Sequence, residues 1–359
     1  MSDLGTAPLL YSARPSIEID GAAQQSLEGG LMSMTVAEDT NGMANCEATF
    51  GNWGSGGRGV DFLYFERDVL DFGKSMLVSM GGGDADAQVF AGRISGLEGR
   101  YPKSRPPEIL VLAEDRFQDL RQTRRTRVFE DASSEDVIRS IASDHGLIPD
   151  LDLDGPTLPA LAQINQSDFA FLQAIARGID AEVWMRGDTL FAHRRSSRDE
   201  GEITLTYGRG LQELSLRADL AHQCSKLVIG GWDVGGKEAV ASEIGPETLS
   251  GESQGDTGSD ILSARFGSRV ERITHHNPGS ATEGDALAKA EYRTRARRFL
   301  TGEGVAEGDG RIRVGSTIIL RGIGALFNGA YTVTAARHLF EIQTGYQTEF
   351  SVERPWIGP

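Results

Sequence analysis

The chain has 359 residues, enough for two or three domains of ordinary size and a substantial core. Hydrophobic residues make up 39% and charged residues 25%, as in a folded soluble protein, and no stretch approaches the roughly 20 apolar residues that a membrane helix needs. The lack of such a stretch leads us to expect no membrane insertion. The net charge of −16 argues against a duplex-DNA-binding surface, which needs Lys and Arg to neutralise phosphates, so we also expect no specific nucleic-acid partner.

The N-terminus lacks a basic patch followed by an apolar run, so the sequence predicts no secretory signal. Residues 1–118 then form a first β-rich region. Apolar residues recur at every second position in short runs separated by glycine, and a Gly-rich loop is expected over 51–59. Short strands at this spacing are typical of a barrel or sandwich. The expected strands are 16–21, 31–38, 46–50, 62–65, 74–80, 88–97 and 108–113.

Residues 119–205 have the pattern of a small α+β module. A basic cluster opens it, and Ser133 or Ser134 followed by acidic residues is typical of a helix start. Val137 and Ile141 supply an apolar face, and Gly146 is expected to end the helix. The basic cluster consists of Arg121, Arg124, Arg125 and Arg127.

Residues 163–191 predict a second helix followed by a hairpin. Asn165 or Ser167 can cap the helix, and Gly178 is expected to end it because glycine tolerates a left-handed conformation. Residues 181–185 and 189–192 alternate like two strands around a turn at 186–188. We expect Phe169, Leu172 and Trp184 to belong to the core of the module.

Residues 206–359 return to a strand pattern and form a second β-rich region. The polar segment 235–261 holds six Asp or Glu and one Lys, and we expect a mobile acidic loop there. A helix is expected over 281–299. The predicted fold class is therefore α+β and mainly β, with two barrels that flank an inserted module. The expected strands are 211–216, 225–232, 313–321, 329–337 and 347–354.

No residue pattern indicates catalytic, cofactor or metal chemistry. His275 and His276 are adjacent and lack a partner at zinc-ligand spacing, and Cys46 and Cys224 cannot form a metal site alone. A disulfide between the two cysteines stays an alternative, although a reducing cytoplasm is the better expectation. Asp144-His145 comes without a G-x-S-x-G nucleophile motif.

Two glycine patterns and one carboxylate pair resemble known ligand or catalytic motifs but lack the context that those motifs need. The run 81–83 lacks the Lys-Ser/Thr of a phosphate loop, and the G-x-G at 322–324 lies between strands rather than between a strand and a helix. Glu114-Asp115 is a carboxylate pair of the kind that glycosidases use, but 52 acidic residues make such pairs common by chance. The arginines of 121–127 could contact nucleic acid, but a solvated face or a subunit interface is favoured.

Four segments together resemble the late-control D family, the central hub proteins of contractile phage tails and related injection particles. They are FAGRISGLE with the strand that ends at Asp115, the run 127–147, the core Ser-Asp-Phe-Ala-Phe-Leu at 167–172, and the C-terminal run 298–350. The hub part of valine-glycine-repeat spike proteins is similar. Their order and spacing, rather than any one motif, carry the resemblance. The segment 235–261 lies outside the pattern.

The resemblance implies a homotrimeric baseplate hub with two tail-tube-like barrels in each subunit. Such a hub adapts a trimeric spike to a hexameric inner tube and needs no active site. Implied partners are a separate spike protein, inner tube or tube-initiator proteins, baseplate wedge proteins and a tape-measure protein. The hub is assembled in the cytoplasm and becomes part of the tail or injection particle. We expect acidic side chains of the barrel strands to face the lumen.

Interface residues are expected in the basic cluster and in the helix 281–299, since arginines there can meet acidic residues of a neighbour. The candidate interface residues are Arg121, Arg124, Arg125, Arg127, Arg293 and Arg297. Two alternatives compete with the hub. The acidic composition leaves a baseplate-associated cell-wall hydrolase open, and the basic cluster leaves a nucleic-acid-binding module open.

Overall fold

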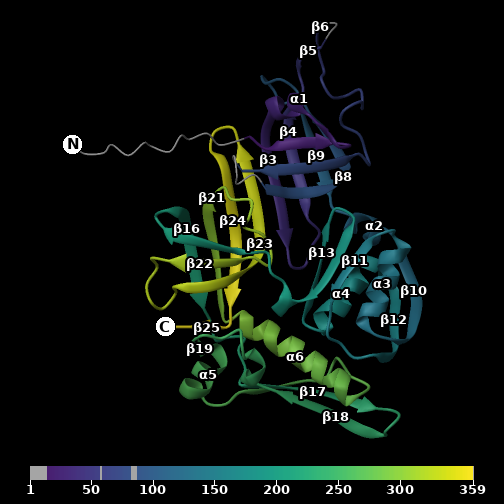
Figure 1. Cartoon of the computed structure of the whole chain (residues 1–359), viewed down its shortest axis with the longest axis vertical. Coiled ribbons are helices and arrows are strands. Elements are labelled where there is room, and N and C mark those ends of the chain that lie inside the picture. The colour runs from purple at the N-terminus through teal and green to yellow at the C-terminus, as the bar shows by residue number, and fades with distance from the viewer. Residues whose placement is uncertain (1–13, 57–58, 82–86, 359) are drawn as a thin grey trace, which may run out of the picture.

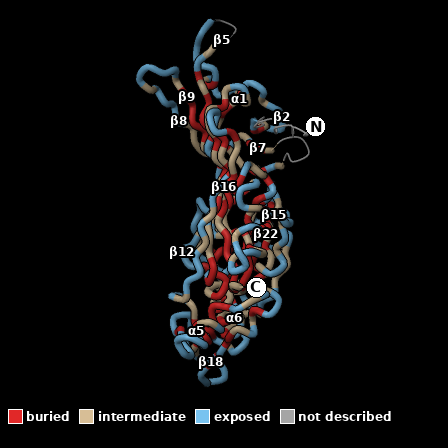
Figure 2. Tube along the Cα trace, turned by 90° about the vertical axis from the view of Figure 1, so that its left-hand side faces the viewer, coloured by how far each residue is buried: buried red, intermediate tan, exposed pale blue. Residues whose placement is uncertain are grey.

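The computed structural model describes residues 14–56, 59–81 and 87–358, and it is mainly β, as predicted (Figure 1). Buried residues form four hydrophobic cores, and Figure 2 shows them running through the middle of the elongated molecule. The expectations for the N-terminus and for most of the glycine run 81–83 lie outside the described residues.

The first core lies at the top of Figure 1 inside a curved antiparallel sheet, with strand order β1-β7-β8-β9-β4-β3. Its side chains come from alternate positions of the strands, for example Met34 and Val36 on β3. The elements are β1 (Ser16–Ile19), β2 (Ala22–Ala23), α1 (Gln25–Gly30), β3 (Leu31–Asp39), β4 (Asn45–Gly51), β5 (Gly54–Gly56), β6 (Gly59–Asp61), β7 (Ser75–Met80), β8 (Ala87–Arg100) and β9 (Glu108–Glu114).

The strand expected over 62–65 was wrong, because this run forms a turn after the short β5–β6 hairpin. The side-chain oxygen of Asn52 accepts hydrogen bonds from the backbone N–H groups of Leu63 and Tyr64, which ties the turn back to the barrel. Phe62 and Phe65 stack with ring centroids 4.8 Å apart instead of pairing in a sheet. Aromatic residues therefore imitated a strand pattern while packing against each other.

The inserted module has its own core, which lies beside the barrels. The Ser133 hydroxyl and the Asp136 carboxylate form a capping box at the start of α3, as the sequence predicts. The helix α4 ends at Gly178 as expected, but Asp180 rather than Gly178 adopts a positive φ of 55°. The elements are α2 (Phe117–Arg121), β10 (Arg124–Ala132), α3 (Ser134–Asp144), β11 (Ile148–Asp152), β12 (Leu158–Ser167), α4 (Asp168–Gly178), β13 (Ala181–Arg186), β14 (Thr189–Arg194) and η2 (Arg195–Ser197).

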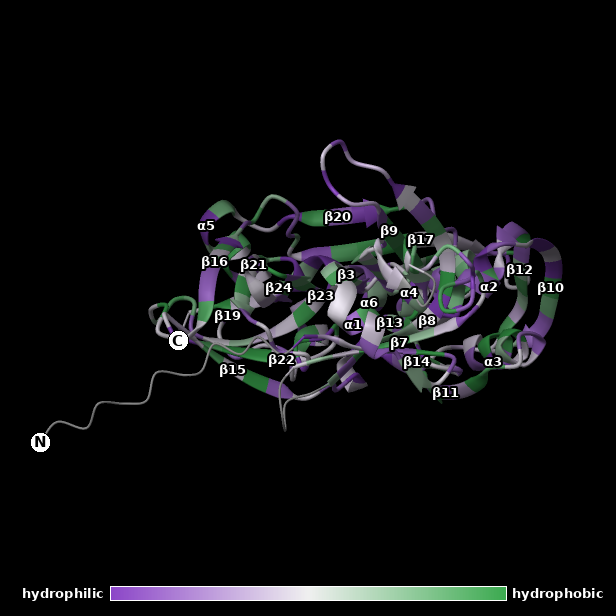
Figure 3. Cartoon of the chain, turned by 90° about the horizontal axis from the view of Figure 1, so that it is seen from above, coloured by the Kyte–Doolittle hydropathy of each residue, from purple (hydrophilic) through white to green (hydrophobic). Residues whose placement is uncertain are grey.

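The predicted basic cluster contributes to an unpredicted two-stranded ribbon. Arg124, Arg125 and Arg127 lie on β10, which pairs only with β12 among the described strands. The ribbon lies at one end of the molecule in Figure 3, where hydrophilic and hydrophobic residues alternate along it. An isolated two-stranded ribbon is marginal on its own, and Phe129 and Leu161 tie this one to the core of the module.

The second β-rich region closes into a six-stranded barrel, because each strand in the order β15-β16-β21-β24-β23-β22 pairs with the next and β22 pairs back with β15. The expected domain boundary between 205 and 206 falls inside β15. The strands are β15 (Glu202–Tyr207), β16 (Gly210–Ala218), β21 (Leu300–Glu307), β22 (Thr317–Arg321), β23 (Gly329–Glu341) and β24 (Gly345–Arg354).

A fourth unit, at the bottom of Figure 1, is inserted between β16 and β21. The helix expected over 281–299 is confirmed as α6, and it packs across a sheet with strand order β18-β17-β20. The elements are β17 (Lys226–Asp233), β18 (Glu238–Ile244), η3 (Pro246–Leu249), β19 (Asp256–Thr257), α5 (Gly258–Phe266), β20 (Val270–Ile273), α6 (Ala281–Arg297) and, after the barrel, β25 (Trp356–Ile357).

The prediction of an acidic loop over 235–261 was wrong, because most of this segment is regular structure. Val240, Ser242 and Ile244 of β18 are buried, while the residues between them are exposed. Two of the charges that suggested a loop, Glu238 and Glu243, are exposed on this strand, and Glu243 pairs with Lys226 of β17. Thr257 then caps α5 through a capping box with Asp260. Because the segment is rich in acidic residues, the alternation of buried and exposed positions that indicates a strand was not recognised in the sequence.

The pairing of β3 with β23 joins both barrels into one 13-stranded sheet. Phe340 of β23 belongs to the core of the first barrel although most of its strand closes the second. Glu38 of β3 in turn pairs with Arg313, which precedes β22, at 2.9 Å. The two barrels therefore share a backbone ladder, a core residue and an ion pair.

The barrels should come apart more readily when the shared core residue is truncated. Phe340→Ala removes a buried ring from the first core, so we expect a loss of about 3–5 kcal/mol in the free energy of unfolding, measured by urea denaturation. The control Arg337→Ala lies on the exposed face of the same strand and removes only a surface pair with Glu349, which is worth at most about 1 kcal/mol. Equal losses in the two variants would contradict the role of Phe340.

Candidate interaction surfaces

The outer face of the 13-stranded sheet extends over both barrels. One row of paired residues crosses it from Glu213 of β16 through Val305, Glu349 and Arg337 to Ala37 of β3. Since successive side chains of a strand point to opposite faces, all members of such a row lie on the same side of the sheet. The register therefore places residues from both barrels on one continuous surface.

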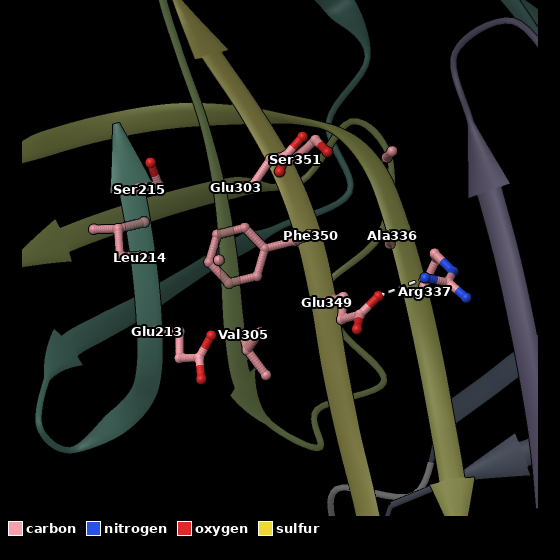
Figure 4. Close-up of a pocket in the computed structure, with 12 residues that line it drawn as sticks. Glu213, Leu214, Ser215, Glu303, Val305, Ala336, Arg337, Glu349, Phe350 and Ser351 are labelled. Atoms are coloured by element: carbon pink, nitrogen blue, oxygen red, sulfur yellow. Dashed lines mark hydrogen bonds and ion pairs between the residues drawn. The ribbon is translucent and has the colours of Figure 1, made fainter. Parts of the chain in front are cut away.

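This surface is hollowed and acidic over the second barrel. The open hollow, of about 510 Å³, is formed by β16, β21, β23 and β24. Figure 4 shows Glu213, Glu303 and Glu349 around it, with Arg337 paired to Glu349 at 2.7 Å. Three carboxylates thus face one guanidinium, and neither Glu213 nor Glu303 has an ion-pair partner among the described residues.

An adjoining hollow extends the surface toward the module and changes its charge. It shares Ser215 and Glu303 with the first hollow and adds Arg195, Arg217 and Arg298. The outer face is therefore acidic near the middle of the second barrel and mixed in charge beside the module. It offers polar contacts to a partner, and the sequence pattern could not reveal it, because β21 was not predicted and β16 was predicted only in part.

Three arginines of the basic cluster pair with carboxylates of the same chain. Arg127 Nη2 donates to Asp168 at 2.9 Å, and Arg125 Nε lies 3.3 Å from the other oxygen of the same carboxylate. Burial alone would raise the pKa of Asp168, but hydrogen bonds from His145 and Gln163 and the arginine charges hold it below its usual value. Arg121 Nη2 donates to both carboxylate oxygens of Glu114, at 2.6 and 2.8 Å.

The remaining predicted arginines differ in exposure. Arg124 donates only to the backbone oxygen of Asn165 and is exposed, so it stays a candidate for contact with another protein. Arg293 is part-exposed and lies 3.3 Å from Asp180. Arg297 is only 4% exposed and donates to Asp180 and Glu252, so its contacts join α6 to the module rather than to another subunit. Whether the exposed arginines form an interface stays a prediction.

A second group of arginines at the same junction was not anticipated from the sequence. Arg195 and Arg198, which follow the hairpin, both pair with Glu182 of β13, and Arg195 also pairs with Glu353 of β24. Arg198 lies 3.9 Å above the ring of Trp184, which therefore contacts this junction as well as stacking on Phe191. Bidentate and stacked arginines are directional, so they orient the module against the second barrel.

The other residue groups considered for chemistry have structural roles. Asp115 accepts hydrogen bonds from the backbone N–H groups of Ala44 and Phe117, and burial raises its pKa to about 7. Glu114 pairs with Arg121, and His145 Nε2 donates a hydrogen bond to the Asp168 carboxylate. His275 and His276 face each other with ring centroids 4.3 Å apart.

Within the described ranges, no group of three or more His, Cys, Asp or Glu is arranged to hold a metal ion. Cys46 and Cys224 are both free and buried in different cores, so the structure contradicts a disulfide between them. None of the described helices is both long and apolar enough to cross a membrane.

Two buried titratable groups lie where the barrels meet. Burial alone would raise the pKa of Glu38, but the charge and hydrogen bonds of Arg313 and the backbone N–H of Val314 lower it to about 2. Burial lowers the pKa of His338 to about 4, and its Nδ1 contacts the hydroxyls of Tyr346 and Thr348. The junction is therefore built for an ionised Glu38 and a neutral His338.

Comparisons with known proteins place this architecture in context. The family model described as the Alg8 N-terminal domain matches residues 13–342. No curated protein matches the chain significantly in sequence. The 43 kDa tail protein of prophage MuSo2 from Shewanella oneidensis has a similar structure, with a TM-score of 0.69, 13% identity, and coverage of 95% of this chain and 98% of that one.

Two further solved structures share the fold. The tail protein from Neisseria meningitidis MC58 superposes with a TM-score of 0.65 at 12% identity, over 95% of this chain and 96% of that one. The c3393 protein of E. coli superposes with a TM-score of 0.61 at 10% identity, over 96% of this chain and 79% of that one. It is described as a component of the type VI secretion system that is structurally similar to the T4 tail proteins gp27 and gp5. The chain therefore has the fold of phage tail and type VI secretion proteins, while its resemblance to the late-control D family stays a prediction.

Acid should weaken the junction of the barrels through Glu38. Its folded pKa of about 2 lies below its ordinary value of 4.5, so its contribution to stability is fully present above pH 4.5 and is lost as the pH falls toward 2. We expect Glu38→Gln to lower the free energy of unfolding at pH 7 by about 3 kcal/mol and to flatten its decline between pH 4.5 and 2. The control Glu349→Gln should leave that decline unchanged, and an unaltered profile in Glu38→Gln would contradict the assignment. Urea unfolding at a series of pH values measures both.

Proposed function

The chain belongs to the family described as the Alg8 N-terminal domain, and we propose, on the grounds of its fold, that it is the structural baseplate hub of a contractile injection system or phage tail. In this role it forms a homotrimer that adapts a trimeric spike to the hexameric inner tube. The hub acts by presenting surfaces of the correct symmetry, and its function requires no catalytic residue.

The observation that carries the proposal is the continuous sheet that unites two six-stranded units in one chain. Three such chains around one axis present six similar units, which is the number that a hexameric tube requires. A trimer with one tube-like barrel per chain would offer only three contact surfaces to the six subunits of the tube. The shared fold with tail and type VI secretion proteins over nearly the whole chain supports the same conclusion.

The rest of the assembly follows from this role. We propose a first tube-like barrel over 1–118, an inserted module from 119 to the residue before β15, and a second tube-like barrel from β15 to 359, the last carrying the unit formed by β17, β18, β20 and α6. The proposed partners are a spike protein, inner tube or tube-initiator proteins, wedge proteins and a tape-measure protein. Assembly in the cytoplasm precedes incorporation into the particle.

We further propose that the acidic outer face of the sheet lines the lumen of the hub. Glu213, Glu303 and Glu349 surround its hollow, and within the described part of the chain only Glu349 of the three has an ion-pair partner. Like charges on a channel wall reduce the adhesion of acidic molecules that pass through it. The overall charge of −16 has the same sign as this face.

A trimer should form when the chain is produced together with its spike. Native mass spectrometry of the co-purified complex should show three copies of the 38.7 kDa chain bound to the spike. The chain alone provides the comparison, since trimer formation can depend on the spike. A chain that stays monomeric in both samples would contradict the hub.

Reversing charge on the outer face should impair transport without preventing assembly. The double variant Glu303→Lys and Glu349→Lys should yield normal numbers of particles in electron micrographs but a severalfold lower fraction emptied after contraction. The control reverses Glu18 and Glu202, which are part-exposed or exposed on strands away from the hollow. Equal emptying in both double variants would contradict the lumen assignment.

A further inference from the structure

A small arginine-lined pocket lies where the end of the second barrel meets the module and the fourth unit. It has a volume of about 290 Å³, near the lower end of the roughly 300–1,000 Å³ of ligand pockets. Its wall includes four arginines but only two carboxylates, Glu252 and Glu353. The arginines are Arg195, Arg198, Arg297 and Arg354.

Three of these arginines have carboxylate partners. Arg195 pairs with Glu182 and Glu353, Arg198 with Glu182, and Arg297 with Asp180 and Glu252. Both carboxylates in the wall are therefore already paired with an arginine other than Arg354. The positive charge that remains in the pocket belongs to Arg354.

Arg354 is 3% exposed, and no carboxylate of the described residues lies within ion-pair distance of it. Its Nη1 and Nη2 donate to the backbone oxygens of Asn328 and Leu326, at 3.0 and 3.2 Å. Its Nε is buried without a hydrogen-bond partner. An arginine stays protonated even when it is buried, so this is a desolvated cation with an unused donor.

The surroundings hold this guanidinium in place. It lies 3.9 Å from the ring centroid of Trp356 and 4.3 Å from that of Tyr331. Gly329 lies so close that a Cβ would come within 2.9 Å of Arg354 Nη1. Two aromatic rings and a bare backbone thus fix the plane of the fork, which is the preorganisation that oxyanion recognition uses.

We propose that this pocket binds an oxyanion, either the carboxylate of an acidic peptide segment or a free phosphate, and that Arg354 is its principal ligand. An incoming oxyanion supplies the missing counter-charge and accepts the hydrogen bond of the unpaired Nε. The small volume suits one carboxylate or phosphate group and excludes a nucleotide. The proposal does not depend on the role of the chain as a hub.

Isothermal titration calorimetry on the full chain tests the proposal with two probes. One is inorganic phosphate, and the other is a capped tripeptide with a central glutamate, both in chloride buffer of matched ionic strength. We expect one site per chain for at least one probe. Arg354→Gln should weaken that binding at least tenfold, whereas Arg337→Gln, a surface arginine on the neighbouring strand, should leave it unchanged.

A second variant keeps the test valid if Arg354→Gln does not fold. Ala330→Leu fills the pocket from β23 without removing a charge, so it too should abolish binding. Binding of phosphate alone identifies a phosphate ligand, and tighter binding of the peptide identifies a protein carboxylate. Absence of binding by both probes, or unchanged affinity in a folded Arg354→Gln or Ala330→Leu chain, would overturn the proposal.

Discussion

The pairing of β3 with β23 is the constraint on which the rest of the structure depends. Seven residue pairs, from Ala335 opposite Asp39 to Glu341 opposite Ser33, join β3 to the part of β23 that extends beyond β22. Exposed strand edges are prone to unwanted pairing, and this ladder covers the side of β3 and the free part of β23. The ladder places one long face, with its acidic hollow, across both barrels.

The arginine contacts at the junction provide the second level of order. Arg195 and Arg198 connect the end of the module to the second barrel, and Arg297 connects α6 to Asp180 of the module. A buried ion pair adds little net stability, because desolvation offsets much of the attraction. Its directionality, however, selects one orientation. We therefore regard these contacts as the reason that three bodies with separate cores keep a defined arrangement.

Local sequence signals succeeded where the residues of an element make their decisive contacts nearby. Ser133 with Asp136 and Ser167 with the N–H of Ala170 cap α3 and α4 as expected, and both hairpin strands of the module lie where the alternation placed them. The signals failed where composition and period disagreed. Acidic residues concealed β18, and the aromatic run 62–65 imitated a strand.

The sequence by itself determined the mainly β class, the position of the α+β module and the helices whose caps and apolar faces are local. Only the tertiary structure decided the functional surfaces. Glu213, Glu303 and Glu349 become neighbours through strand register, and folding leaves Arg354 beyond ion-pair distance of every carboxylate that the structure describes. The physical reason is that capping and periodicity act over a few residues, whereas charge complementarity and pocket shape arise between segments that the chain brings together only when it folds.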